Sequence, residues 1–178
     1  MSEVPTPEKL PIAINDANLF IDLCEVQLIP AFFGLSLVFH TTQLILSELE
    51  DEQMLQLRPY VKSGALCVRH LSQEEIENLD TLSPHSRKLS RQDLSLYFYA
   101  QEIGDCMILT SDNRLRKEAQ RQGFEVHGIL WVLEQMVNQQ LLPPKEVASA
   151  LQDLMLVNAW LPVRECGEML EKWQITMS

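Results

Sequence analysis

Short apolar runs alternate with helix-like periodicity along most of this chain. The runs predict β-strands, because each is four to six residues long and is followed by a polar or turn-forming position; they occupy residues 11–15, 35–40, 65–70, 106–110 and 124–127. Between them, apolar residues recur at spacings of three and four, which is typical of helices that bury one face. Strands that alternate with helices predict an α/β fold with a central parallel sheet of four or five strands.

Capping and breaking residues predict where the helices begin and end. We expect one or two helices over residues 17–33, interrupted near Pro30, and one helix from Thr41 or Thr42 to about Leu57, before Pro59. Ser72 and Ser90 have the spacing to an acidic residue that starts a helix with a capping box, and Gly104 is expected to end the second of these helices. The chain is predicted to be wholly helical after Gly128, with an interruption at residues 143–144 and a final short segment after Pro162.

Length and composition favour one soluble globular domain with an appendage. The chain has 178 residues, of which 46% are hydrophobic and 22% charged, enough to bury a sizeable core. We assign residues 1–10 to a flexible N-terminus, 11–135 to the main domain and 136–178 to a C-terminal helical extension. The sequence shows neither a long apolar run nor a signal peptide, so we expect a cytoplasmic protein without membrane contact.

The overall charge argues against broad attraction to nucleic acid. The formal net charge is −11, which repels a polyanion at long range. The segment from Arg87 to Arg121 is an exception, because it holds seven basic and five acidic residues. Basic residues are therefore concentrated in one part of an acidic chain.

Four acidic residues are candidates for a site: Asp16, Glu48, Asp93 and Asp112. Asp16 and Asp112 follow apolar strands, and the carboxyl ends of parallel strands meet at one edge of a sheet. Each of the two aspartates also suits a simple helix N-cap, and Asp93 suits a capping box with Ser90. Glu48 is expected on the apolar face of its helix, where an unpaired charge needs compensation.

A divalent cation would satisfy all four carboxylates together. Mg²⁺ and Mn²⁺ prefer hard oxygen ligands and keep several bound waters, which leaves room for a phosphate. The four histidines have no helical pairing that would suggest zinc, and the four cysteines are spread too widely for a thiolate site. The pattern therefore predicts a magnesium or manganese site.

The order of these motifs resembles the PIN domain, a three-layer α/β/α family of metal-dependent nucleases that includes toxins of bacterial toxin–antitoxin pairs. The resemblance is carried by residues 16–18, 47–49, 90–95 and 109–114, and it covers residues 11–135. It implies that Asp16, Glu48, Asp93 and Asp112 form the family's acidic quartet, with Asp16, Asp93 and Asp112 as the direct metal ligands.

The resemblance also implies further site residues and partners. Asn18, Thr110 and Ser111 match polar positions of the family. Asn113 stands where some members have another acid, and its neutral amide would weaken a second metal position. Arg114 and Arg116 are expected to hold flanking phosphates of an RNA substrate, in a track that Arg87, Lys88 and Arg91 extend. Expected partners are RNA, an antitoxin protein and a second copy of the chain in a homodimer.

Two other functions fit the same residues. The first is a catalytically weak or inactive PIN-fold module that binds protein, which the acidic net charge and Asn113 favour. The second is a phosphatase with an aspartate at a strand end. Such enzymes usually need a second aspartate two residues after the first, where this chain has Asn18, so we place this hypothesis last.

Overall fold

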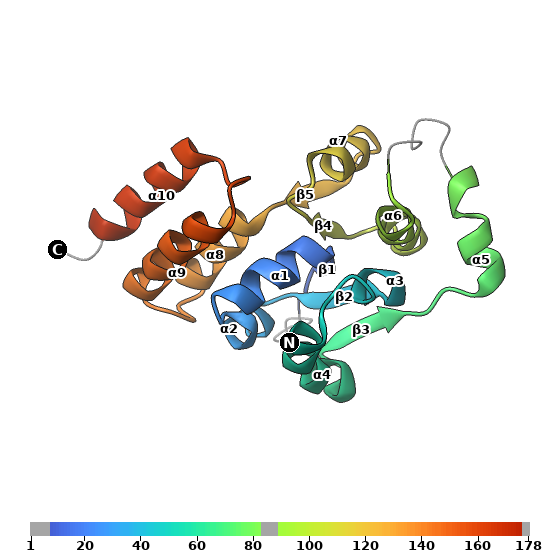
Figure 1. Ribbon diagram of the computed structural model, residues 1–178, viewed down its shortest axis with the longest axis horizontal. Helices are drawn as coiled ribbons and strands as arrows, with labels where there is room; N and C mark the ends of the chain where they lie inside the picture. Colours follow the sequence, from blue (N-terminus) through green and yellow to red (C-terminus); the bar gives the residue numbers. More distant parts are fainter. Residues whose placement is uncertain (1–7, 83–88, 176–178) are drawn as a thin grey trace, which may run out of the picture.

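A computed structural model of the chain describes residues 8–82 and 89–175 (Figure 1). The predicted flexible N-terminus falls largely outside these residues, as do Arg87 and Lys88 of the predicted phosphate track. Within the described ranges, every helix is too short or too polar to cross a lipid bilayer.

The centre of the fold is one parallel sheet of five strands, as the sequence predicted. Its strands are β1 (Ile12–Asn15), β2 (Val38–Thr42), β3 (Leu66–Arg69), β4 (Met107–Leu109) and β5 (Glu125–His127). Their order across the sheet is β3-β2-β1-β4-β5. The chain first moves outward from β1 to β3 and then returns to β4 on the other side of β1. The order therefore reverses between β1 and β4, and α/β sheets bind ligands outside the carboxyl ends of the strands at such a reversal.

Helices cover both faces of the sheet, which gives the α/β/α layers of the predicted fold (Figure 1). The helices are α1 (Ala17–Glu25), α2 (Ile29–Phe33), α3 (Gln43–Leu46), α4 (Asp51–Ser63), α5 (Gln73–Glu77), α6 (Arg91–Ile103), α7 (Asn113–Arg121), α8 (Ile129–Asn138), α9 (Pro144–Val157) and α10 (Val163–Ile175). Helices α1, α2 and α4 pack together, and α8 joins them by contacting α2. Helices α8, α9 and α10 gather at one end of the molecule and α5 lies at the other (Figure 1).

The predicted single helix from Thr42 to Leu57 is wrong. The structure has two helices, α3 and α4, separated by a turn at residues 47–50. Glu50 and Gln53 form a capping box that starts α4 afresh, which ends any continuation from α3. Helix α4 then continues through Pro59 and ends at Gly64, whose φ of 80° suits glycine.

Two other helix boundaries differ from prediction. Pro30 lies in the first turn of α2 instead of interrupting a helix, and a proline there loses no intrahelical hydrogen bond. The break precedes it, at Gln27, whose φ is 57°. The final segment after Pro162 is a helix of 13 residues rather than a short piece.

One hydrophobic core joins the sheet to the C-terminal helices. Ile14 and Leu109 of the sheet are fully buried, as are Leu133 of α8 and Leu151 of α9. All four belong to the same cluster, together with Trp173 of α10. Helix α8 also runs through residue 135, where we placed the end of the main domain.

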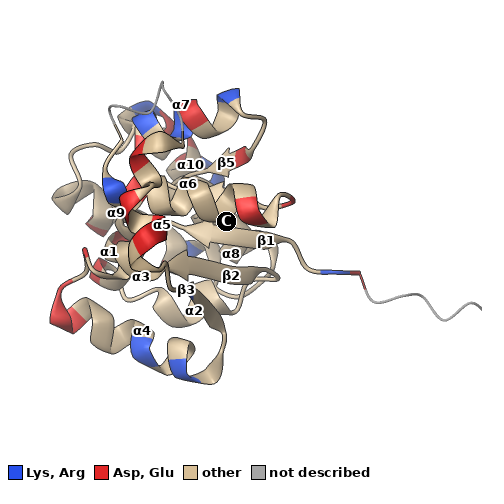
Figure 2. Ribbon diagram, turned by 90° about the vertical axis from the view of Figure 1, so that its right-hand side faces the viewer, with Lys and Arg blue, Asp and Glu red and all other residues tan. Residues whose placement is uncertain are grey.

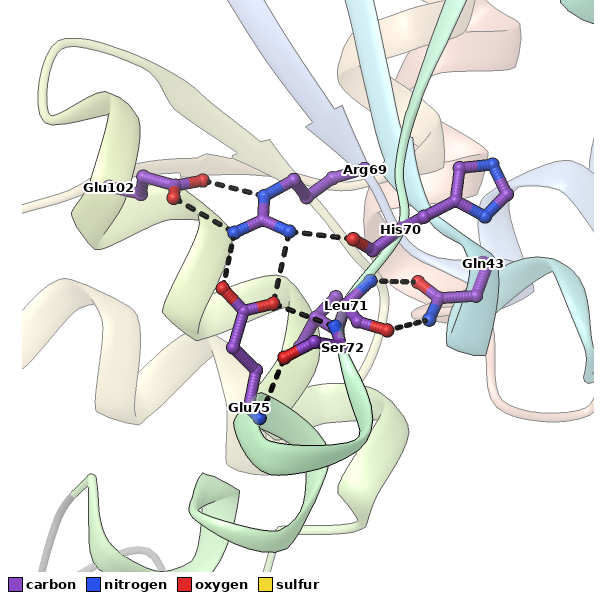
Figure 3. A network of polar contacts seen from close by, with 7 residues as sticks. All are labelled: Gln43, Arg69, His70, Leu71, Ser72, Glu75 and Glu102. Atoms are coloured by element: carbon purple, nitrogen blue, oxygen red, sulfur yellow. Dashed lines mark hydrogen bonds and ion pairs between the residues drawn. The ribbon is translucent and has the colours of Figure 1, made fainter.

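A polar network fixes the outer strand β3 to its neighbours (Figure 3). The guanidinium of Arg69 pairs with Glu75 at 2.8 Å and with Glu102 of α6 at 3.0 Å, and these contacts raise its pKa. Gln43 completes the network, since its side-chain amide donates to the carbonyl of Leu71 and accepts from the same residue's N–H. The network therefore ties the end of β3 to α3, α5 and α6.

Candidate active site

The four predicted carboxylates line one cavity at the point where the strand order reverses. The cavity has a volume of about 630 Å³, and its wall consists of Asp16, Ala17, Asn18, Ile21, Glu48, Leu89, Ser90, Asp93, Asp112 and Arg114. Asp16 directly follows β1, and Asp112 follows β4 after two residues. The sheet thus brings together acids that are far apart in the sequence, and we call this space the acidic cavity.

Asp16 is the most buried of the four, with 4% of its surface exposed. Its Oδ1 accepts a hydrogen bond of 2.8 Å from the N–H of Ala17, so it caps α1 as the simpler interpretation predicted. Its Oδ2 accepts a bond of 2.7 Å from the hydroxyl of Thr110. Asp16 therefore both begins a helix and presents its carboxyl group to the cavity.

Asp112 is linked to Asp16 through the same hydroxyl. The N–H of Asp112 donates to Oγ1 of Thr110 at 3.0 Å, and that oxygen donates onward to Asp16. Oδ1 of Asp112 accepts from the N–H groups of Arg114 and Leu115 and so caps α7. Thr110, which the family resemblance suggested as a site residue, thus connects the two strand-end aspartates.

Asp93 enters the cavity from the first turn of α6. It forms the predicted capping box with Ser90, whose Oγ accepts from the Asp93 N–H at 3.1 Å. Because Ser90 fixes the start of the helix, Asp93 is held half-buried at the cavity wall. Two other residues of α6, Leu94 and Tyr97, pack into the interior on its apolar side.

Glu48 reaches the cavity by a different route from the one predicted. It lies exposed in the turn between α3 and α4, not on the buried face of a continuous helix. The turn still places it on the wall beside Asp16 and Asp93. Glu48 therefore lines the same cavity as the other three acids, whereas the predicted helical setting is wrong.

Burial and mutual repulsion make these carboxyl groups hard to ionise. Burial raises the pKa of Asp16 to about 7, opposed by the Thr110 hydrogen bond and increased by the charges of Asp93 and Glu48. Burial also raises the pKa of Asp93, and the charge of Asp112 adds to the effect. The pKa of Glu48 rises through partial burial and the charge of Asp93. A cavity that concentrates negative charge in this way favours protons or a cation.

Buried hydroxyl groups join the strands and helices that carry the cavity, and sequence analysis considered two of them, Thr41 and Thr42, only as helix caps. The hydroxyls of Thr42 and Ser95 lie 2.7 Å apart, joining β2 to α6. Thr41 donates to the carbonyl of Asn15 at 2.9 Å, joining β2 to β1. Thr41 and Thr42 are polar residues at the end of an apolar run, a signal that any helix cap would also produce, whereas Ser95 lies within α6.

The remaining predicted residues divide between two spaces. Asn18 and Arg114 line the acidic cavity, and Oδ1 of Asn18 accepts from the N–H of Ser111 at 3.2 Å. Ser111, Asn113 and Arg116 line a neighbouring cavity instead. Helix α7 carries several of the basic residues (Figure 2). Arg91 was predicted to extend the phosphate track; its Nη2 lies 4.0 Å from Oδ2 of Asp80, so the two side chains form an ion pair.

The carboxylate oxygens of the acidic cavity suit a hard divalent cation, but their side chains do not converge as they would around a bound metal ion. Within residues 8–82 and 89–175, no three histidine, cysteine, aspartate or glutamate side chains have an arrangement that would hold a metal ion. Among the described residues, the wall of the acidic cavity nevertheless has four carboxylates and neither histidine nor cysteine. That donor set fits Mg²⁺ or Mn²⁺ and does not fit zinc.

The α/β/α layers, and the acids gathered where the strand order reverses, agree with the PIN domain that the sequence motifs resemble. A family model described as a PIN domain (DUF3368) matches residues 12–174 of the chain. The protein belongs to the PIN domain family. The match includes the C-terminal helices as well as the sheet. A search of curated proteins gives no match to this sequence.

Proposed function

We propose that the protein is an endoribonuclease that hydrolyses phosphodiester bonds with Mg²⁺ or Mn²⁺. The observation that carries the proposal is the convergence of four carboxylates, from four separate segments, on the acidic cavity. Together with the nuclease-like family, such a cavity supports metal-dependent phosphoryl chemistry better than any other reaction.

Each acid has a distinct part in this proposal. Asp16, Asp93 and Asp112 would hold the metal, which supplies an activated water and stabilises charge on the phosphate. Thr110 keeps the Asp16 carboxyl oriented through its hydrogen bond of 2.7 Å. Glu48, on an exposed turn, is free to orient the attacking water, and Arg114 on the same wall would bind a flanking phosphate.

The raised pKa of Asp16 supports a cation at this position. With a pKa of about 7, the carboxyl group is partly protonated at neutral pH. A bound cation would replace that proton, so metal binding should release protons and strengthen with rising pH. The hydrogen bonds from Ala17 and Thr110 hold the Asp16 carboxyl group in place for such an exchange.

A cleavage assay tests the proposal. Wild type should cleave single-stranded or structured RNA only with Mg²⁺ or Mn²⁺, and Asp16→Asn should abolish the cleavage. Asp105→Asn is the matched control, because Asp105 lines a different cavity, at the amino ends of the strands. Equal cleavage by wild type and Asp16→Asn would remove the proposal.

A second candidate function is a PIN-fold module that binds protein with little or no activity. Three observations favour it: the net charge of −11, the amide Asn113 on the turn beside the cavity, and the separation of the carboxylates described above. In a toxin–antitoxin pair, an arginine of the antitoxin would enter the acidic cavity. An antitoxin and a homodimer therefore remain proposals under either function, and a solution mass measurement tests the homodimer.

A further inference from the structure

A second cavity lies beside the acidic cavity, across the turn from β4 to α7. Its volume is about 480 Å³, and its wall includes Ser111, Asn113, Arg116, His127, Trp131 and Trp160. Asp112 and Arg114 face the acidic cavity, whereas Ser111 and Asn113 face this one. The turn after β4 and the start of α7 therefore contribute residues to both spaces.

The side chain of Trp160 is exposed to solvent, whereas its backbone is hydrogen-bonded to a neighbouring residue. Its side chain is 95% exposed, which is unusual for the most costly side chain to leave in water. The backbone N–H of Trp160 donates to Oδ1 of Asn158 at 3.0 Å. Nδ2 of Asn158 in turn donates to both carboxyl oxygens of Asp22 at 3.2 Å. The next residue, Leu161, is buried with 8% exposure. The indole is thus an exposed ring on a fixed support.

A stacked pair of aromatic rings lines the same cavity. The rings of His127 and Trp131 stack with centroids 4.2 Å apart and an angle of 10° between their planes. His127 closes β5 and Trp131 lies in the first turn of α8, so both come from elements that pack into the core. Rigid aromatic rings at the wall of a polar cavity are the platforms on which proteins stack nucleic-acid bases.

Arg116 supplies a cation to this cavity without a partner of its own. Among the described residues no carboxylate pairs with it, and its Nε is buried without a hydrogen-bond partner. Its guanidinium lies against Gly128, where an added Cβ would come within 2.9 Å of Nη2. The glycine therefore leaves the space that Arg116 occupies. A guanidinium with unsatisfied donors is suited to a phosphate.

The wall combines the polar, charged and aromatic groups that a nucleotide needs. Ser111, Asn113 and Arg116 offer polar groups next to the aromatic rings, a mixture that suits a base with its phosphate. Within the part of the chain that the structure describes, Glu165 is the one acidic residue of the wall, and it comes from α10 rather than from the side that borders the acidic cavity. Leu156, Val157 and Val163 are also exposed close to Trp160 in the sequence, so a second copy of the chain is the competing occupant, and it would bury the indole in a dimer.

We propose that this second cavity is a nucleotide subsite, in which Trp160 stacks on a base of the RNA strand and Arg116 binds the adjoining phosphate. The inference rests on the proposed nuclease function, since the acidic cavity would then hold the scissile phosphate of the same strand. It explains how a chain of net charge −11 binds RNA: the contact is local and partly aromatic instead of a broad electrostatic attraction.

Binding of a short fluorescein-labelled oligouridylate, followed by anisotropy in EDTA, tests the subsite without any cleavage. Trp160→Ala should weaken binding between about 5-fold and 100-fold, the loss expected for one stacked base. Trp160→Phe should restore most of the affinity because it keeps a ring. Leu156→Ala is the control, since Leu156 is 85% exposed on the neighbouring helix but does not line the cavity. Arg116→Gln should reduce the salt dependence of binding by about one ion.

The outcomes separate this inference from the proposed function. Unchanged binding by Trp160→Ala, with cleavage by wild type intact, overturns the subsite and leaves the nuclease in place. If wild type binds oligouridylate in the predicted manner but never cleaves RNA, the result supports the subsite contacts and overturns the proposed nuclease function. A change from dimer to monomer in Trp160→Ala, measured by light scattering, would show that a second copy covers the indole, and it would also overturn the subsite.

Discussion

The hydroxyl of Thr110 donates a hydrogen bond of 2.7 Å to the carboxyl group of Asp16, although 94 positions separate the two residues in the chain. The bond spans the two strands between which the sheet reverses its order, because β1 and β4 are direct neighbours. The same hydroxyl oxygen accepts from the N–H of Asp112. Thr110 thus connects two of the proposed metal ligands and limits how far they can separate.

Replacing this hydroxyl should weaken the site without removing any acid. Thr110→Val keeps the shape but leaves Asp16 without its buried donor, and comparable supporting residues change metal affinity or activity by about 10- to 100-fold. We expect Mn²⁺ affinity and RNA cleavage to fall by such a factor. Thr110→Ser retains the hydroxyl and should stay close to wild type. Equal losses in both variants would assign the effect to packing instead of the hydrogen bond.

Asp16 should make stability depend on pH in metal-free buffer. Its pKa is about 7 in the folded protein against a reference value of 3.8, so the folded state favours the protonated form. Its contribution to the free energy of unfolding is therefore fully present below about pH 4 and is lost as the pH rises through about 7, with a total change of roughly 4 kcal/mol. Asp16→Asn cannot ionise, so it should be more stable than wild type at about pH 8, with the difference shrinking towards pH 4.

Urea unfolding of both proteins across this pH range measures the difference directly. The other carboxyls with raised pKa values, including Asp93 and Glu48, remain in both proteins, so the difference reports Asp16 together with its repulsion of these two groups. A wild-type protein that is as stable as the variant at about pH 8 would contradict the raised pKa.

The hydrogen bonds between Asn158 and Asp22, which hold the backbone near Trp160, should also stabilise the fold. Burial raises the pKa of Asp22 to about 6, and the hydrogen bonds from Asn158 oppose that rise. Asn158→Leu would leave a buried carboxylate unpaired and should lower the free energy of unfolding by about 1–3 kcal/mol at neutral pH. The pKa of Asp22, followed by NMR titration, should rise further. Gln152→Leu, at an exposed position of α9, is the control and should change neither quantity.

The Arg69 network should stabilise the protein more than an exposed ion pair does. Arg69 is partly buried and contacts Glu75 and Glu102 through several hydrogen bonds, whereas Arg164 and Glu168 form a pair on the surface of α10. We expect Arg69→Gln to cost about 1–3 kcal/mol of unfolding free energy, because the bonds involve charged groups. Arg164→Gln should stay within about 0.5 kcal/mol of wild type. Thermal unfolding of the two variants side by side checks this, and equal shifts would argue against a special role for the network.

Periodicity and capping signals identified the sheet and the acidic group, but not the local setting of every acid. Asp16 and Asp112 follow apolar strands, and a parallel sheet places such residues at one edge whatever the details of its helices. Glu48 was placed on a helix face because Leu44 and Ile45 precede it at helical spacing. The structure has a turn there, since the capping box of Glu50 begins a new helix.

The cavity containing Trp160 was beyond the reach of sequence patterns. It forms where the turn after β4 meets the loop between α9 and α10, and contacts between such distant segments leave no periodic signal. Ser111, Asn113 and Arg116 were singled out only through the family resemblance, and without structure nothing separated them from Arg114 on the other side of the turn. Asn158 and Asp22 had no signal at all, because their pairing spans 136 positions.

The most direct test of the account is calorimetric titration with Mn²⁺, because the central claim is that distant carboxylates form one cation site. Wild type and Asp105→Asn should give the same heat of binding, since Asp105 lies outside the acidic cavity. Asp112→Asn should lose that heat. A wild-type protein that gives no heat, or an Asp112→Asn variant that binds Mn²⁺ as well as wild type, would contradict the claim.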